Sequence, residues 1–326
     1  MSEASHTNAG IPKRPSDEYS DEGRKYSRNL AESDGIRNTK LVAEHYNARP
    51  EVGVQKRKES SIFRMKSFNN WVKSVLIGQY AKRGDRVLDM GCGKGGDLLK
   101  WSKAKISELV GADVASVSIQ QAEQRYQSMR GAKFAASFHA IDCWTESLYK
   151  VIPKDKMFDV VSMQFCLHYA FETEAKARMM LQNVSQNLRP GGTFIGTLPD
   201  AYWIVKKVKS VEGLSFGNDI YKIEFEQKDT FPTFGHKYWF TLEDAIDNCP
   251  EYLVHFPTFE KLAKEYGLEL IKKRKFHHLY KDALENEEFT NLLHRMNVVD
   301  ERESITKEEW EAAGIYLAFA FRKMES

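Results

Sequence analysis

Long hydrophobic runs are missing from this 326-residue sequence. No apolar stretch approaches the roughly 18–20 residues that a membrane-spanning helix needs, so the sequence predicts no transmembrane helix. The first residues are polar, and we therefore expect no secretory signal peptide. What remains is the ordinary composition of a globular protein, with 42% hydrophobic and 29% charged residues.

Cysteines are few and widely spaced. Cys92, Cys143, Cys166 and Cys249 include no C-x-x-C pair, which argues against a zinc site and against a disulfide framework. We expect four buried thiols of a protein in a reducing compartment, and no bound metal.

A large net charge is also missing, because 48 Lys and Arg residues stand against 46 Asp and Glu residues. Proteins that coat long stretches of nucleic acid are usually strongly basic, so this class is disfavoured. A polyanionic partner would have to be held locally, by a few placed cations.

The sequence divides into a short tail and one long domain. Residues 1–35 have almost no large apolar side chains, so we expect a disordered tail. Within it, Pro12–Pro15 is a weak candidate for a nuclear import signal. Residues 36–326 form the predicted catalytic domain, which begins with a helical segment at 36–83. An apolar stripe at helical spacing marks that segment: Phe68, Trp71, Val72, Val75 and Leu76.

Strands and helices alternate after residue 83. This rhythm predicts an α/β fold with a mostly parallel sheet covered on both faces. Residues 200–256 are more antiparallel in pattern and predict an inserted β-rich segment. We expect strands at 85–90, 108–114, 135–142, 158–165, 193–199, 219–225, 237–244, 268–279 and 314–323, and helices at 98–104, 117–129, 174–188 and 257–267. The Arg189–Gly192 turn should separate the third of these helices from the next strand.

A glycine cluster follows the first strand. Residues 91–96 satisfy G-x-G-x-x-G, and Asp113 ends the next strand. Alone, this pattern also fits a nicotinamide dinucleotide site. Asp89 argues against that interpretation, because a carboxylate before the glycines would repel a pyrophosphate. It would tolerate the positive sulfonium of S-adenosylmethionine, so the pattern resembles the first motif of class I methyltransferases. Asp142 after the third strand agrees.

In such a fold the cofactor lies across the carboxyl ends of the strands. Asp113 would accept hydrogen bonds from both ribose hydroxyls, and Asp142 would accept one from the adenine amino group. Lys73 would pair with the methionine carboxylate. From spacing alone, a solvated helix face is the simpler interpretation of Lys73, which shares that face with Asn69.

Longer strings resemble one family within this class, the messenger RNA cap guanine-N7 methyltransferases. The resemblance runs from about His45 to the C-terminus, although the segment between Phe289 and Thr306 is shorter than in longer relatives. It rests on GCGKGGDLLKW at 91–101, FNNWVKSVLIG at 68–78, QFCLHYAFE at 164–172, SFGNDIY at 215–221, PEYLVHFP at 250–257 and IYLAFAFRK at 315–323.

The resemblance implies a Rossmann-like, seven-stranded class I fold and the transfer of a methyl group from S-adenosylmethionine to N7 of the GpppN cap. The products would be m7GpppN-RNA and S-adenosylhomocysteine. It also implies action in the nucleus, beside mRNA guanylyltransferase and RNA polymerase II. For the cofactor it implicates Lys73, Gly91, Asp113, Asp142, Gln164 and Tyr169, to which we add Asp89. For the cap it implicates Asn69, Asn70, Lys94, Lys100, Arg125, His168, Glu251 and Tyr316.

These roles make chemical sense. Glu251 would accept hydrogen bonds from N1–H and the amino group of guanine, and His168 would donate to O6. Lys94, Lys100 and Arg125 would hold the triphosphate. Guanine N7 is already unprotonated near neutral pH, so we expect no catalytic general base, and catalysis would come from proximity and in-line orientation. Further basic residues at 206–209 and 272–275 are more typical of solvated faces, and contact with the RNA body is the alternative.

Two other hypotheses remain open at this point. A methyltransferase for a small molecule or a different RNA would use the same fold without the purine-binding acid and the three cations. An RNA-binding module with a vestigial fold would have lost its cofactor residues, yet Asp89, Asp113 and Asp142 are all present.

Overall fold

The computed structural model describes residues 38–45, 47–48, 60–131 and 134–325. The chain divides into two compact units, Met1–Lys40 and Leu41–Ser326. All elements discussed below belong to the second unit. The tail expected at residues 1–35 lies outside the described residues.

The apolar stripe expected in the N-terminal segment is the buried face of helix α3 (Phe63–Tyr80). Phe68 and Trp71 stack with ring centroids 5.9 Å apart, and every residue of the stripe is fully buried. Asn69 and Lys73 lie on the other face and are only partly buried. Helical periodicity therefore identified both the helix and the side that it turns to the core.

A seven-stranded sheet forms the centre of the molecule, in the order β10-β11-β5-β4-β1-β2-β3. Strand β11 is antiparallel to both of its neighbours, while β1 to β5 pair in parallel. The strands are β1 (Arg86–Met90), β2 (Glu108–Asp113), β3 (Ala135–Ala140), β4 (Phe158–Gln164), β5 (Leu188–Pro199), β10 (Leu268–Lys275) and β11 (Tyr316–Lys323).

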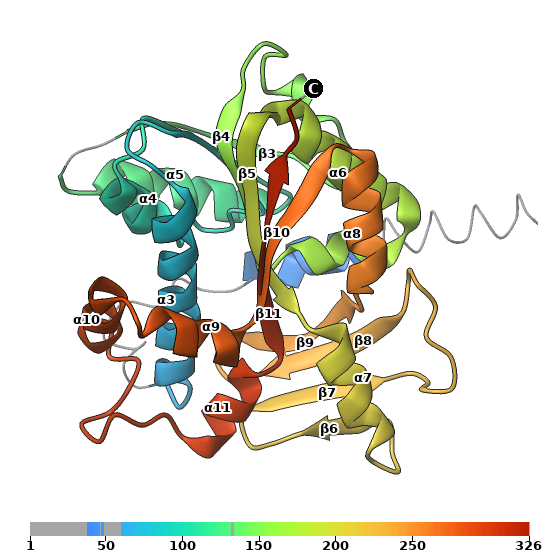
Figure 1. The fold of residues 1–326 in the computed structure, drawn as a ribbon. Coiled ribbons are helices and arrows are strands. Elements are labelled where there is room, and N and C mark those ends of the chain that lie inside the picture. Colours follow the sequence, from blue (N-terminus) through green and yellow to red (C-terminus); the bar gives the residue numbers. More distant parts are fainter. Residues whose placement is uncertain (1–37, 46, 49–59, 132–133, 326) are drawn as a thin grey trace, which may run out of the picture. The chain divides into compact units, whose positions relative to one another are not determined.

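Helices cover both faces of this sheet. Figure 1 shows α3, α4 (Leu98–Ala104) and α5 (Ser116–Ser128) on one side, with α6 (Glu174–Asn187) and α8 (Phe256–Glu265) on the other. Successive strand residues alternate between two hydrophobic clusters: Val87 belongs to the cluster that contains α3, and Leu88 to the cluster that contains α6. Burial on both faces explains why these strands are continuous apolar runs in the sequence.

A second, antiparallel sheet lies between β5 and β10 in the sequence. Helix α7 (Ala201–Lys209) leads into β6 (Ser215–Gly217), β7 (Tyr221–Phe225), β8 (Lys237–Leu242) and β9 (Ile246–Tyr252), which pair in that order. The α/β class I fold with an inserted β-rich segment is thus confirmed. The expected β7–β8 pair is present, whereas the strands β6 and β9 were not predicted.

Two local predictions were wrong in part. The strand expected at 268–279 ends at Lys275, and α9 (Phe276–Ala283) begins there, because Phe276, Leu279 and Ala283 bury one helical stripe. Helix α6 ends at Asn187, before the Arg189–Gly192 turn as expected, but β5 already starts at Leu188, with irregular pairing before Thr193. The remaining elements are the short helices η1 (Leu148–Lys150) and η2 (Leu167–Glu172), α10 (Glu287–Arg295) and α11 (Lys307–Ala313). Among the described residues no helix has the length and apolarity to cross a membrane.

Candidate functional site

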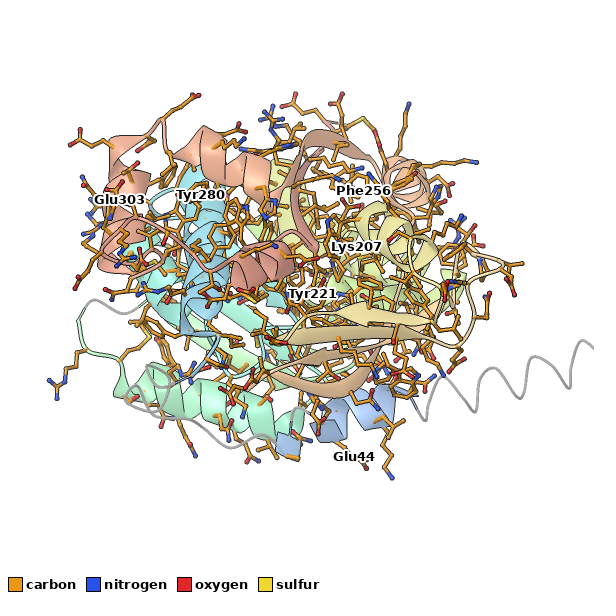
Figure 2. The ribbon with its side chains drawn as sticks, turned by 90° about the horizontal axis from the view of Figure 1, so that it is seen from below. Glu44, Lys207, Tyr221, Phe256, Tyr280 and Glu303 are labelled. Carbon is orange, nitrogen blue, oxygen red and sulfur yellow. The ribbon has the colours of Figure 1, made fainter. Side chains whose placement is uncertain are left out.

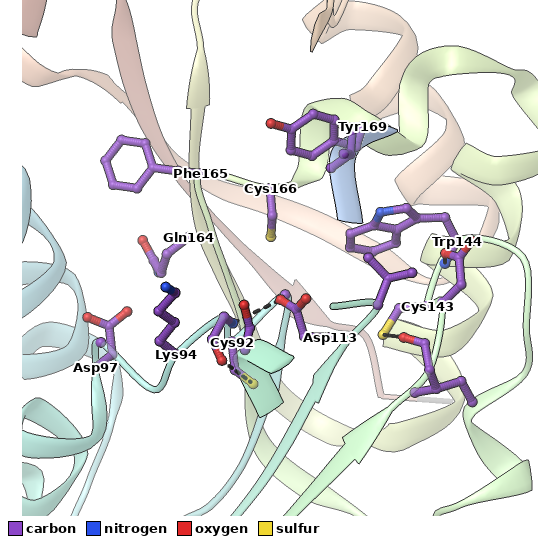
Figure 3. A pocket seen from close by; sticks show the side chains of 18 of the residues that line it. Cys92, Lys94, Asp97, Asp113, Cys143, Trp144, Gln164, Phe165, Cys166 and Tyr169 are labelled. Carbon is purple, nitrogen blue, oxygen red and sulfur yellow. Dashed lines mark hydrogen bonds between the residues drawn. The ribbon is translucent and has the colours of Figure 1, made fainter. Parts of the chain in front are cut away.

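A cavity of about 430 Å³ opens where β1, β2 and β4 end. Figure 3 shows side chains from all three strand ends pointing into it. The cavity brings together six of the seven residues expected to bind the cofactor and two of the cations expected to bind the cap. These are Lys73, Gly91, Asp113, Asp142, Gln164 and Tyr169, with Lys94 and Arg125.

The glycine loop is shaped by its backbone. Gly91 has φ of +73°, and a Cβ there would lie 2.5 Å from Sγ of Cys166. The N–H groups of Gly91 and Cys92 donate to the carbonyl oxygen of Ala112, and that of Gly93 donates to Asp113. Only glycine fits the first position without strain and collision. The N–H groups of the first three loop residues are thus used within the protein.

Asp113 holds the glycine loop and the next helix together. One carboxylate oxygen accepts from Gly93 N–H and the other from Ala115 N–H, both at 2.9 Å. Burial raises the pKa of this carboxyl, and the two N–H donors oppose that rise. A carboxylate has about four lone-pair positions, so Asp113 can still accept hydrogen bonds from a ligand in the cavity that it lines.

Two further polar side chains are oriented by the protein around the cavity. Asp142 accepts from the N–H of Trp144 at 2.9 Å, and the indole of Trp144 lines the cavity beside it. Gln164 accepts from the Thr197 hydroxyl at 3.2 Å. Both side chains are thus fixed at a strand end, as binding groups need to be.

Asp89 occupies a different place from the one expected. It does not line the cavity and is only 5% exposed. Burial and the nearby Asp97 charge raise its pKa to about 8, although Lys73 opposes this. Asp89 is therefore mostly protonated near neutral pH, and the expected repulsion of a pyrophosphate by its charge does not apply as argued from the sequence.

This raised pKa predicts how the stability of an Asp89→Asn variant depends on pH. The folded state binds the Asp89 proton more tightly than the unfolded chain, so its contribution is complete below the unfolded pKa and declines as pH rises towards 8. The asparagine variant lacks this decline. Its advantage in unfolding free energy should therefore grow by up to about 1.4 kcal/mol per pH unit between about pH 5 and pH 7.5.

Chemical denaturation at several pH values measures that difference. Asp159→Asn is the control with opposite sign: burial raises its pKa, but the N–H of Arg86 and the Arg189 guanidinium outweigh this and lower it. The loss of unfolding free energy in Asp159→Asn should be largest above the unfolded-state pKa of Asp159 and should fade in acid. A pH-independent difference between wild type and Asp89→Asn would contradict the assignment.

Asp97, which no motif in the sequence singled out, is a further charged acid of the site. Its Oδ1 lies 2.7 Å from Nζ of Lys73 and 2.7 Å from Nζ of Lys100. Burial would raise the Asp97 pKa, but these two lysines lower it well below its ordinary range. Lys100 also donates to Oδ1 of Asn70 at 3.0 Å. The signal in the sequence was an acid directly after the glycines and three residues before Lys100.

Lys73 and Lys100 are therefore less free than expected. Lys73 lines the cavity, as expected of a partner for the methionine carboxylate, but pairs with Asp97. Lys100 lies outside the cavity lining and has its ammonium bound by Asp97 and Asn70. A negative ligand group would have to share these lysines with Asp97.

Glu251 and His168 form a buried pair beside the cavity. Their side chains are 4% and 2% exposed, and Oε1 of Glu251 lies 3.4 Å from Nε2 of His168. The hydroxyl of Tyr238 donates to Oε2 of Glu251 at 2.7 Å. The rings of His168 and Tyr169 are 4.3 Å apart, and Tyr169 also lines the cavity. Tyr169 thus connects the cavity with the glutamate, which comes from the inserted sheet.

Two other residues expected at the cap, Tyr316 and Asn69, lie on β11 and α3. Tyr316 packs its ring 5.0 Å from that of Phe165, a cavity residue with φ of +60° that the sequence analysis did not identify. Such a φ is strained for an aromatic residue and is characteristic of functional sites. Oδ1 of Asn69 is buried and accepts no hydrogen bond from the described residues.

The cavity fits S-adenosylmethionine better than a dinucleotide. The N–H groups of Gly91, Cys92 and Gly93 already have acceptors within the protein, so these three are not available to a pyrophosphate. The carboxylates of Asp113 and Asp142 can accept hydrogen bonds from the hydroxyl and amino groups of S-adenosylmethionine, which carries no phosphate. Within the described ranges, no group of three metal-ligating side chains occurs.

Comparisons with known proteins indicate the same family as the sequence motifs, over most of the chain. A family model described as the mRNA (guanine-N(7))-methyltransferase domain matches residues 29–324. Proteins named mRNA cap guanine-N(7) methyltransferase are similar in Cryptococcus neoformans (46% identity, covering 94% of this chain and 45% of that protein), Schizosaccharomyces pombe (47%, covering 87% and 82%) and Saccharomyces cerevisiae (44%, covering 87% and 70%).

The chain spans about half the length of its Cryptococcus neoformans relatives. Among solved structures, an S-adenosylmethionine-dependent methyltransferase from Clostridium acetobutylicum is 15% identical with a TM-score of 0.48, covering 80% of this chain and 92% of that one.

Proposed function

Because this chain belongs to the mRNA (guanine-N7)-methyltransferase family, we propose that it methylates N7 of the terminal guanine of GpppN-capped mRNA. S-adenosylmethionine supplies the electrophilic methyl group and leaves as S-adenosylhomocysteine. The observation that supports this best is the buried Glu251–His168 pair next to the cavity, because a small-molecule methyltransferase has no need of a purine-binding acid there.

The residues around the cavity have complementary tasks in this proposal. Asp113 accepts from the ribose hydroxyls, Asp142 accepts from the adenine amino group, and Lys73 faces the methionine carboxylate. Gly91 lets the loop backbone pack closely against Cys166, because any side chain at this position would collide with it. Gln164 and Tyr169 close the cavity on the side of the guanine.

Glu251 and His168 read the edge of the guanine. A buried carboxylate accepts from N1–H and the amino group together, while adenine has no donor at position 1. Sites that depend on such bonds reject analogues by roughly 10⁴-fold or more, because their buried polar groups would remain unpaired. Asn69, Asn70 and Tyr316 complete this pocket in the proposal.

No general base is required. N7 has a free lone pair near neutral pH, and the departing thioether needs no proton. Catalysis then depends on holding the two reactants in line, which supplies about 7–11 kcal/mol of the barrier. His168 therefore acts as a donor to O6 of guanine rather than as a base.

Lys94 and Arg125 line the cavity, as does Lys73, and we assign Lys94 and Arg125 to the triphosphate together with Lys100. Lys94→Ala and Arg125→Ala should each raise the KM for capped RNA. Each should also reduce the slope of log KM against log salt by about 0.7–0.9. Lys103→Ala, an exposed lysine in the last turn of α4, is the matched control and should leave the slope unchanged. Equal slopes in all three variants would place the triphosphate elsewhere.

The deciding experiment is methyl transfer from radiolabelled S-adenosylmethionine. GpppG-capped RNA should accept label at N7, whereas the same RNA with a 5′-triphosphate end should not. Labelling of a metabolite extract with capped RNA inert would instead support a small-molecule methyltransferase.

We further propose that the protein acts in the nucleus, beside mRNA guanylyltransferase and RNA polymerase II. Caps form on nascent transcripts, so a cap methyltransferase needs access to that machinery. Fluorescent tagging of the full chain tests the location, and crosslinked immunoprecipitation tests the two partners. Exclusion from the nucleus would overturn this part of the proposal.

A further inference from the structure

An exposed aromatic ring and several cations gather where α7, the start of α8 and β10 meet. Tyr202 is 52% exposed, and exposed lysines follow it at i+4 and i+7 on one face of α7. Two lysines of β10 are two residues apart and so point to one side of the strand. We call this surface the α7–β10 patch. It comprises Tyr202, Lys206, Lys209, His255, Lys273 and Lys275.

Direct contacts join the parts of the patch. The hydroxyl of Tyr202 lies 3.3 Å from Nε2 of His255. Nζ of Lys273 lies 4.0 Å from the ring centroid of Phe256 and 5.9 Å from that of Tyr202. Figure 2, seen from below, labels Phe256 at the start of α8 and Lys207 on α7. Alternating cations and aromatic rings suit a ligand with both phosphates and bases.

The patch has an excess of positive charge. Its four lysines have two carboxylates close by: Asp200, 3.1 Å from Lys275 and nearly buried, and Glu260, which acts on Lys273. The cations on the opposite side of β10 differ. Arg274 pairs with Asp282 at 2.8 Å, and Lys272 donates to Gln79 at 2.8 Å. Lys272 keeps its charge, because its partner is a neutral amide, but the positive excess is larger on the α7 side of the strand.

The patch adjoins the strand end that carries Tyr316, the residue expected at the cap. Lys275 pairs in register with Leu317, the residue after Tyr316. On the other side of β11, Tyr316 pairs with Pro199, which precedes Tyr202 by three residues. Neighbouring strands lie about 4.8 Å apart, so the backbone of the patch begins one strand away from Tyr316. The side chain of Tyr316 packs on the other face of the sheet, so a ligand that reaches both passes around this end of the sheet.

We propose that the α7–β10 patch binds the first nucleotides of the single-stranded RNA beyond the cap. Lys206, Lys209, Lys273 and Lys275 neutralise phosphates, and Tyr202 stacks on a base. This rests on the proposed function and extends it to the RNA body, which the guanine pocket and triphosphate cations do not contact. Four local cations also explain how a chain with a net charge of +2 binds a long polyanion.

The test compares two substrates, the GpppG dinucleotide and a capped RNA of about 20 nucleotides. In Lys206→Glu/Lys209→Glu, the KM for the capped RNA should rise about tenfold at low salt, with a salt slope shallower by about two. The KM for GpppG should not change. Tyr202→Ala should raise the RNA KM with little change in slope. The matched control is Lys150→Glu/Lys154→Glu, the same charge change at exposed residues before the amino end of β4.

The outcomes separate the hypotheses. A capped-RNA KM that changes equally in patch and control variants would overturn the proposal, as would a wild-type KM that is the same for both substrates. If the patch variant instead loses binding of a poly-glutamate peptide while the RNA KM is unchanged, the surface serves an acidic protein. Failure of wild type to methylate GpppG at all would contradict the proposed function itself, independently of the patch.

Discussion

Asp113→Asn should lower the affinity for S-adenosylhomocysteine by about 100-fold or more while the protein stays folded. The amide keeps one acceptor but turns a donor towards either Gly93 N–H or Ala115 N–H, which Asp113 accepts at 2.9 Å. It also removes the charged acceptor proposed for the ribose hydroxyls. Hydrogen bonds to charged groups contribute about 1.5–3 kcal/mol each, and two of them account for the expected loss.

Isothermal titration calorimetry measures the affinity, and thermal unfolding checks the fold. Asp159→Asn is a matched control, because Asp159 also accepts a backbone N–H, from Arg86 at 2.7 Å, but at the amino end of β4. It should keep the wild-type affinity. Unchanged affinity in folded Asp113→Asn would remove Asp113 from the cofactor site.

Most of the fold followed from periodicity in the sequence. The stripe of α3 and the apolar runs of the central strands depend only on which side chains face the core, and residues three, four or two apart report this locally. The ends of helices and strands were harder to predict. At Lys275 the basic run gave no sign that the strand ends, and the buried helix stripe of α9 became visible only once its contacts with β10 and β11 were known.

The candidate site was predicted less completely, for reasons that depend on tertiary contacts. The position of Asp97 was visible after the glycines, but its pairing with Lys73 depends on where α3 packs. The protonation of Asp89 depends on its burial and on Asp97, neither of which a linear pattern contains. The Glu251–His168 pair joins segments 83 residues apart, and only the family resemblance placed both residues at the guanine.

Glu251→Gln should raise the KM for capped RNA by about 100-fold and leave S-adenosylhomocysteine affinity unchanged. The substitution preserves shape, but one acceptor oxygen becomes a donor. That donor must face the Tyr238 hydroxyl, His168 or the guanine N1–H and amino group. Towards guanine the new donor meets another donor and a hydrogen bond is lost, and towards Tyr238 or His168 the direction of the bond must reverse. In a buried site an unpaired polar group costs about 1–3 kcal/mol, and more when charged. The cofactor cavity does not include Glu251, so its affinity has no reason to fall.

Glu172→Gln is the matched control. Glu172 also accepts a tyrosine hydroxyl, from Tyr252 at 3.0 Å, and is partly buried in an ion pair with Lys176, but it has no proposed contact with guanine. Steady-state kinetics with GpppG-capped RNA, together with calorimetry of S-adenosylhomocysteine, separates the two effects. If Glu251→Gln and Glu172→Gln raise the KM equally, the effect comes from packing around η2. If neither raises it, guanine is recognised by other residues and the buried Glu251–His168 pair only stabilises the junction of the two sheets.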